Sequence, residues 1–196
     1  MTPRTAQASR RTRETDITLA LTLDGSGKTE ITTGIGFLDH LLTALAFHAR
    51  WDLTLRATGD LQVDDHHTAE DTALALGAAL SESLGDRAGV TRFGARYAPL
   101  DEALARAVVD LSGRPYARVA LGLTREALGT LACENISHWL RSFATAAAIT
   151  LHVDMLEGEN DHHRAEAAFK AVALALRDAA ARTGASAVPS TKGSLA

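Results

Sequence analysis

The sequence predicts an α+β fold made of two duplicated β-β-α-β-α halves, each a small sheet covered on one face by helices. Two observations lead to this class. A six-residue motif, Asp-His-His-x-Ala-Glu, occurs at residues 65–70 and again at residues 161–166, 96 positions later. Around each copy, segments with the two-residue period of strands and segments with the helical period follow in the same order. Gene duplication is the simplest explanation of both.

The first half contains three segments with strand periodicity and two with helical periodicity. The first two strands flank a turn at Asp24–Gly27 and therefore predict a hairpin. The second helix begins at the motif and ends at Gly85, because glycine commonly terminates helices. In chain order we expect strands at 17–23 and 28–33, a helix at 36–48, a strand at 53–58 and a helix at 66–84.

The second half repeats this order. Two strands flank the turn Ser112–Pro115, and the second motif copy begins a helix that ends near Gly184. The linker 86–100 is mixed in composition, and we assign no element to it. In chain order we expect strands at 103–111 and 116–123, a helix at 135–148, a strand at 149–156 and a helix from 161 to about 184.

These elements divide the chain into four segments. Residues 1–12 are basic and are expected to be disordered. Residues 13–93 and 94–187 form the first and second half-repeats. Residues 188–196 form a polar, turn-rich tail, which composition alone would also class as disordered.

Composition is that of an ordinary globular protein and excludes several classes. The 196 residues, 46% hydrophobic and 22% charged, suffice for a sizeable core. A net charge of −4 argues against a general nucleic-acid binder. No stretch reaches the roughly 18 apolar residues of a membrane span, and the basic start lacks the apolar run of a secretory signal. The single cysteine, Cys133, excludes an intrachain disulfide. We therefore expect a cytoplasmic protein without nucleic-acid or membrane partners.

Each motif copy offers imidazole and carboxylate ligands at helical spacing, as a transition-metal site requires. The first histidine and the glutamate are four residues apart and lie on one helix face. The second histidine is turned by about 100° and points elsewhere, so each pair serves two ions. The Asp before each pair would cap the helix, and Asp64, Asp65 and Asp71 are candidates for orienting the imidazoles, unless they are simply solvated. Solvated histidines in a first helical turn are the alternative, which the repeated frame disfavours.

Two further histidines, His40 and His138, lie in the helices that precede the motif copies and are 98 positions apart, close to the motif offset. Either one alone would more often be a core residue, but their matched positions favour a ligand role. Duplication thus predicts two six-coordinate ions with open positions for substrate, and ligand chemistry alone would name zinc first. His48 is a candidate substrate contact. The predicted metal ligands are His40, His66, His67, Glu70, His138, His162, His163 and Glu166.

This ligand set is compatible with two kinds of protein that use bound metal in different ways. A metal-dependent hydrolase would use the ions to activate water. A metal-binding or storage protein, assembled through histidine-bridged contacts, would hold many weakly bound ions and show no substrate dependence.

Six segments resemble the imidazoleglycerol-phosphate dehydratase family of histidine biosynthesis. They occur in the family's order and cover roughly residues 13–195. Residues Met1–Arg11 match nothing in that pattern, and Thr191 stands where a second serine is common. The segments are Thr33–His40, Arg56–Asp60, Asp64–Asp71, Leu111–Pro115, Gly158–Asn160 and Pro189–Gly193.

The resemblance implies a ribosomal protein S5 domain 2-like fold and two Mn²⁺ ions per active site, held by the eight predicted ligands. It implies a hydro-lyase that converts D-erythro-imidazole glycerol phosphate to imidazole acetol phosphate. The ions would act as Lewis acids on an imidazolate-like intermediate rather than by making hydroxide. It also implies a homo-oligomer of 24 subunits with active sites at subunit contacts. No phosphatase-like domain precedes the matching region, so we expect the dehydratase alone.

The resemblance further implies residues that contact a small phosphorylated imidazole substrate. Glu14, otherwise only a charge before a strand, becomes the candidate for proton transfer. Several hydrogen-bond donors match positions expected to hold the phosphate, although each Arg or Lys alone would be read as a solvated surface charge. Phosphate would then order the tail. The implied phosphate contacts are Arg92, Arg114, Lys170, Ser190 and Lys192.

Overall fold

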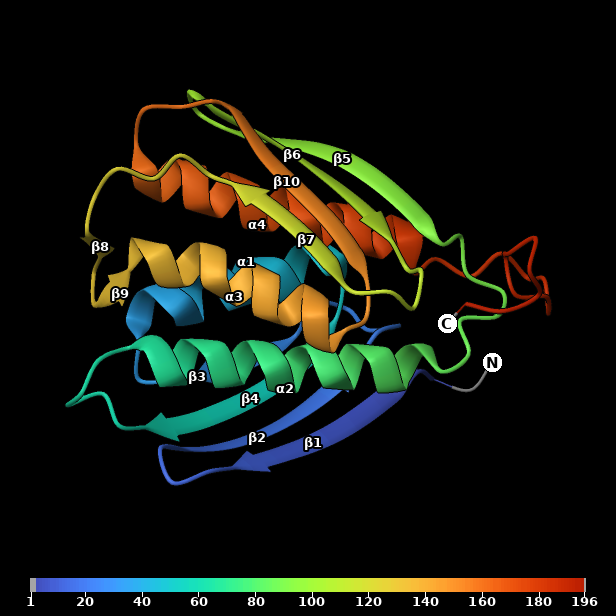
Figure 1. Ribbon diagram of the computed structural model, residues 1–196, viewed down its shortest axis with the longest axis horizontal. Coiled ribbons are helices and arrows are strands. Elements are labelled where there is room, and N and C mark those ends of the chain that lie inside the picture. The colour runs from blue at the N-terminus through green and yellow to red at the C-terminus, as the bar shows by residue number, and fades with distance from the viewer. Residues whose placement is uncertain (1–2, 196) are drawn as a thin grey trace.

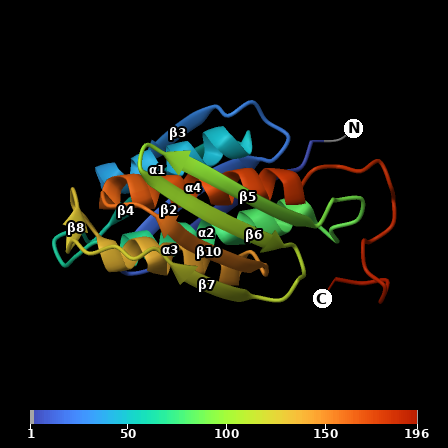
Figure 2. The same ribbon diagram turned by 90° about the horizontal axis from the view of Figure 1, so that it is seen from above.

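Two four-stranded sheets form the outer layers of the molecule, and the helices lie between them (Figure 1 and Figure 2). The structure is a computed structural model that describes residues 3–195. The α+β class and the duplicated layout are confirmed. The first half contains β1 (Thr5–Arg11), β2 (Thr15–Thr22), β3 (Thr29–Thr32), α1 (Gly36–Ala49), β4 (Asp52–Gly59) and α2 (His66–Leu84). The second contains β5 (Phe93–Leu100), β6 (Ala103–Asp110), β7 (Tyr116–Ala120), β8 (Ala127–Leu128), β9 (Leu131–Ala132), α3 (Cys133–Ala146), β10 (Thr150–Glu157) and α4 (Asp161–Ala179).

The two large sheets have the same topology. Their strand orders are β1-β2-β4-β3 and β5-β6-β10-β7, and in each the last pair, β3 with β4 or β7 with β10, is parallel. A parallel pair needs a crossover connection, which here contains α1 or α3. The small hairpin of β8 and β9, which was not predicted from the sequence, leads into α3.

The predicted hairpin between residues 17–23 and 28–33 is wrong, because β4 lies between these strands. The connecting loop is held to the start of β4. Asp52 Oδ1 accepts backbone N–H groups from Ser26, Gly27 and Lys28 at 2.7, 3.1 and 3.0 Å. These bonds direct the polypeptide past β2 and into a strand at the far side of β4.

Each sheet begins with an edge strand that the sequence pattern did not reveal. The disorder predicted for residues 1–12 is wrong for residues 5–11, which form β1 and pair antiparallel with β2; residues 1–2 lie outside the described residues. The buried positions of these strands, Ala6 in β1 and Gly94 and Ala98 in β5, carry very small side chains. Without large apolar residues, the alternation that marks a half-buried strand is weak.

The helices pack across the two halves: α1 lies against α4, and α2 lies against α3. α2 also covers β1 and β2, while α4 covers β5 and β6. The buried aromatic residues Trp139 and Phe143 of α3 stack with ring centroids 5.2 Å apart and an interplanar angle of 11°. Among the described residues, no helix has the length and apolarity to cross a membrane.

Close contact between α2 and α3 gives a test of this packing. A Cβ added at Gly77 of α2 would lie 2.5 Å from the Phe143 carbonyl oxygen and 2.8 Å from Ala146 Cβ. In a free helix alanine is favoured over glycine, but here overpacking should dominate. We expect Gly77→Ala to lower the free energy of unfolding by about 1–3 kcal/mol, measured by chemical denaturation at fixed protein concentration.

The matched control is Gly36→Ala, since a Cβ at Gly36 meets nothing within 4 Å. This variant should unfold at the same denaturant concentration as the parent or slightly above it. A Gly77→Ala protein as stable as its parent would contradict the close helix contact.

Candidate metal centre

The first group of predicted ligands comes together between α2 and α3. His66 and Glu70 lie one turn apart on α2, and His138 faces them from α3. Their ligand atoms lie within 4.8 Å of one another. His138 Nε2 is 3.2 Å from Glu70 Oε1, and the rings of His66 and His138 stack with centroids 4.9 Å apart. We call this group the α2–α3 cluster.

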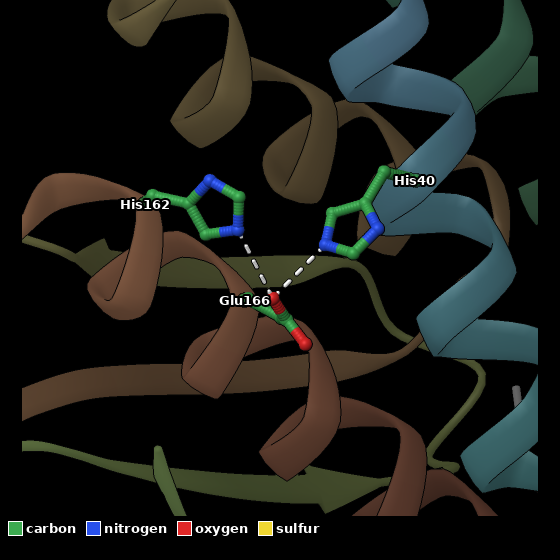
Figure 3. Close-up of side chains that lie close together, drawn as sticks. All are labelled: His40, His162 and Glu166. Atoms are coloured by element: carbon green, nitrogen blue, oxygen red, sulfur yellow. Dashed lines mark hydrogen bonds and ion pairs between the residues drawn. The ribbon is translucent and has the colours of Figure 1, made fainter. Parts of the chain in front are cut away.

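A second group of the same composition lies between α1 and α4. Figure 3 shows His162 and Glu166 on α4, with His40 approaching from α1. Both Nε2 atoms face one oxygen, Glu166 Oε2, at 2.9 Å for His40 and 3.2 Å for His162. The two imidazoles are 44% and 46% exposed, so a ligand can reach the group from solvent. We call it the α1–α4 cluster.

Each cluster takes residues from both halves of the protein. The predicted juxtaposition of first histidine and glutamate is confirmed in both motif copies. The third member comes from the other half, because α1 packs on α4 and α2 packs on α3. Sequence periodicity identifies the residues on each helix but does not identify which helices meet.

The second histidine of each pair turns away from the first, as predicted. The ring planes within the two pairs are 80° and 87° apart. A carboxylate holds Nδ1 of each outward ring: Asp60 lies 3.0 Å from His67, and Glu102 lies 2.7 Å from His163. These two hydrogen bonds raise the pKa of both imidazoles. They also fix the rings so that Nε2 remains available for another partner.

A further acid lies near Nε2 of each outward ring. Glu14 Oε1 is 3.7 Å from Nε2 of His67, and Asp101 Oδ2 is 3.8 Å from Nε2 of His163. Glu14 lies in the turn between β1 and β2, and Asp101 lies in the turn between β5 and β6. The two acids therefore occupy matching places in the two halves. Glu14, the candidate for proton transfer, is next to a predicted metal ligand.

Asp65 occupies the predicted cap position of α2 but makes no side-chain cap bond there, and in both motif helices the capping side chain stands one residue earlier than predicted. Asp64 Oδ1 accepts the backbone N–H of His66, and Asn160 Oδ1 accepts that of His162, each at 2.9 Å. The predicted caps, Asp65 and Asp161, have another role.

Asp65 and Asp161 connect the motif helices to the segment before α3. Asp65 Oδ2 accepts the N–H of Ala132 at 2.7 Å, and Asp161 Oδ2 accepts those of Thr124 and Arg125 at 2.8 and 2.7 Å. Burial raises the pKa of Asp161, but these donors outweigh it and the net pKa is lowered. The shared use of this segment fixes the starts of α2 and α4.

The residues that orient the imidazole rings were not predicted from the sequence. They are Asp60, Glu102 and Asn135, and Asn135 Oδ1 lies 3.0 Å from Nδ1 of His66. Asp64, Asp65 and Asp71 are not these residues: two hold backbone N–H groups, and Asp71 accepts from Thr15 Oγ1 at 2.5 Å and pairs with an arginine. Asp60 stands in a motif segment and could have been considered. Glu102 is 61 residues from His163 and gave no such signal.

Charge at the α1–α4 cluster is governed by Lys170, one turn after Glu166 on α4. Lys170 Nζ lies 2.7 Å from Glu166 Oε1, the oxygen that does not face the histidines. Burial would raise the pKa of Glu166, but Lys170 and His40 lower it to about 2. Glu166 is therefore anionic at neutral pH, as a metal ligand must be.

His48, a predicted substrate contact, lies near the same cluster at the end of α1. Burial and then the charge of Lys170 lower its pKa. A neutral ring results at physiological pH. Of these two predicted substrate contacts, Lys170 touches a predicted metal-ligand cluster, and His48 lies about two turns beyond His40 on α1.

The remaining predicted phosphate contacts gather at the other end of the subunit. Arg92 Nη1 donates to the Pro189 carbonyl at 2.8 Å, and the Arg92 N–H donates to Ala179 at the end of α4. Ala179 lies thirteen residues after Glu166, roughly 20 Å along the helix. In Figure 1 the starts of α2, α3 and α4 are at the end of the molecule opposite the two termini. The contacts at the far end are Arg92, Arg114, Ser190 and Lys192.

The donor sets of both clusters suit a transition-metal ion. Each brings together two imidazole nitrogens and one carboxylate oxygen, the ligand types of zinc, iron and manganese sites. Three ligands leave coordination positions for groups from outside the cluster. Of the predicted phosphate contacts, a single subunit places Lys170 at a cluster and the other four at its far end.

Proteins of one family are similar to this one over most of its length. Residues 33–176 match the family model described as Imidazoleglycerol-phosphate dehydratase. The sequence is 54% identical to the Schizosaccharomyces pombe enzyme of that name, covering 98% of this chain and 100% of that protein. It is 57% identical to the Phytophthora nicotianae protein of that name, covering 98% of this chain but 43% of that longer protein. The crystal structure of IGPD from Pyrococcus furiosus in complex with (S)-C348 has a TM-score of 0.83 and 40% identity, covering 96% of this chain and 100% of that one. The chain therefore belongs to the imidazoleglycerol-phosphate dehydratase family, hydro-lyases of histidine biosynthesis.

Proposed function

We propose that this protein dehydrates D-erythro-imidazole glycerol phosphate to imidazole acetol phosphate in a manganese-dependent reaction with an imidazolate-like intermediate. The supporting observation is the pair of matched clusters, each with two imidazoles and a carboxylate, together with the acid Glu14 beside the predicted ligand His67. The proposal includes a cytoplasmic location, for which the single thiol of Cys133, buried and outside any disulfide, is the argument.

Two Mn²⁺ ions would be held per active site. One would be bound by His66, Glu70 and His138, and the other by the α1–α4 cluster. The outward rings of His67 and His163 would complete these sites in neighbouring subunits, because neither ring belongs to a cluster of its own subunit and each is held by a carboxylate through Nδ1. The bound ions supply Lewis-acid chemistry that stabilises negative charge on the substrate's imidazole ring.

A side chain of the protein would take up the proton. Glu14 Oε1 would accept a proton from the second side-chain carbon of the substrate, next to the carbon that is attached to the imidazole ring. The electron pair of the broken C–H bond would form a C=C bond between these two carbons as the hydroxyl on the ring-attached carbon leaves, and that hydroxyl would take up a proton to become water. The resulting enol tautomerises to the ketone.

The separation of the phosphate contacts supports an assembly. Arg92 and the tail are at the opposite end of the subunit from the clusters, so a substrate touching both needs more than one subunit. We propose a homo-oligomer of 24 subunits, the number that the family resemblance implies, with active sites at subunit contacts.

The role of Glu14 can be tested with Glu14→Gln. This change removes the proton acceptor but keeps the shape, so kcat should fall by about 10²–10⁴-fold while manganese content and particle size stay unchanged. Enzyme assays and metal analysis measure both. Glu30→Gln, at a side chain on β3 that is 73% exposed, is the control and should retain full activity. Parental turnover by Glu14→Gln would exclude the assignment.

The role of metal in assembly can be tested by acid and by chelation. The pKa of His67 and of His163 is raised by Asp60 and Glu102, so protons compete with metal at a higher pH than they would at an unperturbed imidazole. Binding should be complete at about pH 8 and lost by about pH 5. Light scattering should show a smaller particle at the acid pH, and also at the alkaline pH with a chelator, with recovery when Mn²⁺ is restored. A particle of constant size after complete metal loss would show that metal does not link subunits.

A further inference from the structure

The two clusters have the same ligands but differ in the charges around them. The motif offset matches Lys170 on α4 to Leu74 on α2, and both positions are partly buried. Glu166 thus shares its carboxylate between two histidines and an ammonium group. The matching position beside Glu70 is an uncharged hydrocarbon. The same offset pairs Arg177 on α4 with a serine on α2, so the excess of positive charge continues along α4.

The support of the imidazoles differs as well. Asn135 of α3 is buried and holds Nδ1 of His66 at 3.0 Å. The residue at the corresponding place on α1 is Phe37, whose ring lies against His162 with centroids 4.9 Å apart. A hydrogen bond to Nδ1 fixes the tautomer and leaves Nε2 free to ligate. The α2–α3 cluster is therefore the better organised of the two for a cation.

Cations on the other helices do not cancel this difference. Arg141 follows His138 on α3, but it is exposed, and solvent screens its charge. Lys170 is 20% exposed and in direct contact with the ligand carboxylate. A cation so placed opposes a divalent ion at short range.

We infer that the two ions are held unequally: the α2–α3 cluster binds first and tightly, and the α1–α4 cluster holds a weaker, exchangeable ion because of Lys170. The inference rests on the proposed function only in taking both clusters as metal sites. Lys170 thus acts on the ion through Glu166, by occupying one carboxylate oxygen and adding positive charge.

The test is titration of the full-length, metal-stripped protein with MnCl₂ at about pH 8, where the imidazoles are free to ligate, with free Mn²⁺ followed by electron paramagnetic resonance. We expect two classes of site whose dissociation constants differ about tenfold or more. His40→Ala should remove the weaker class, and His138→Ala should remove the tighter one. The opposite assignment, or two equal classes in the parent, would overturn the inference.

Two reciprocal variants test the cause of the difference. Lys170→Gln should tighten the weaker class about tenfold, bringing the two classes together. Leu74→Lys places an ammonium group one turn after Glu70 and should weaken the tighter class by a similar factor. Leu74→Gln is its matched control, because it removes the leucine without adding charge and should leave the tighter class near its parental affinity. Circular dichroism and light scattering verify that each protein is folded and assembled.

The outcomes separate this inference from the proposed function. A protein that binds two Mn²⁺ unequally, with the expected assignment, supports the inference whether or not it dehydrates the substrate. Affinities unchanged in Lys170→Gln, or weakened equally in Leu74→Lys and Leu74→Gln, would refute the role of charge. Absence of any bound Mn²⁺ would refute the proposed function and the inference together.

Discussion

The site depends on helix packing between the two halves of the protein. A histidine of one half can meet a glutamate of the other only because α1 lies against α4 and α2 lies against α3. Small side chains permit this approach, as at Gly77, which leaves no space for a Cβ beneath the Phe143 carbonyl. The alanines of α4 are buried in the same way against β5 and β6. The composition that obscures the edge strands in the sequence is thus what brings the ligands into contact.

The histidines fall into two groups, according to which ring nitrogen faces a carboxylate. His40, His162 and His138 face the glutamates through Nε2. The outward rings are held through Nδ1 instead, by Asp60 and Glu102. Neutral and cationic forms of an imidazole differ little in free energy near neutral pH, so a hydrogen bond that the ring donates to one carboxylate both orients the ring and raises its pKa. In the proposed assembly the outward rings would serve clusters of neighbouring subunits, so that assembly and chemistry would be linked.

Much of the fold and the ligand set could be predicted from local patterns, and the failures have a common cause. Helical spacing placed His162 beside Glu166, and duplication added His40 and His138. Contacts between residues distant in sequence were not accessible: the insertion of β4 between β2 and β3, or the bond of Glu102 to a ring 61 residues away. The capping side chains were misplaced by one residue because two polar residues precede each histidine pair, and only the backbone conformation decides which of the two side chains accepts the first N–H groups.

Internal duplication supplies two similar candidate cation sites, but the proposed reaction would treat them differently. The substrate has an imidazole at one end and a phosphate at the other, so a binding site with equal charge on both sides would not orient it. The two clusters differ because Lys170 adds positive charge beside Glu166 in the α1–α4 cluster. They differ also because Asn135, which holds His66 in the α2–α3 cluster, is matched by Phe37 at the α1–α4 cluster. The α1–α4 cluster combines a carboxylate already satisfied by an ammonium group with imidazoles open to solvent. Under the proposed function, an anionic substrate would compete for Lys170 and would thereby free an oxygen of Glu166 for an ion held at this cluster.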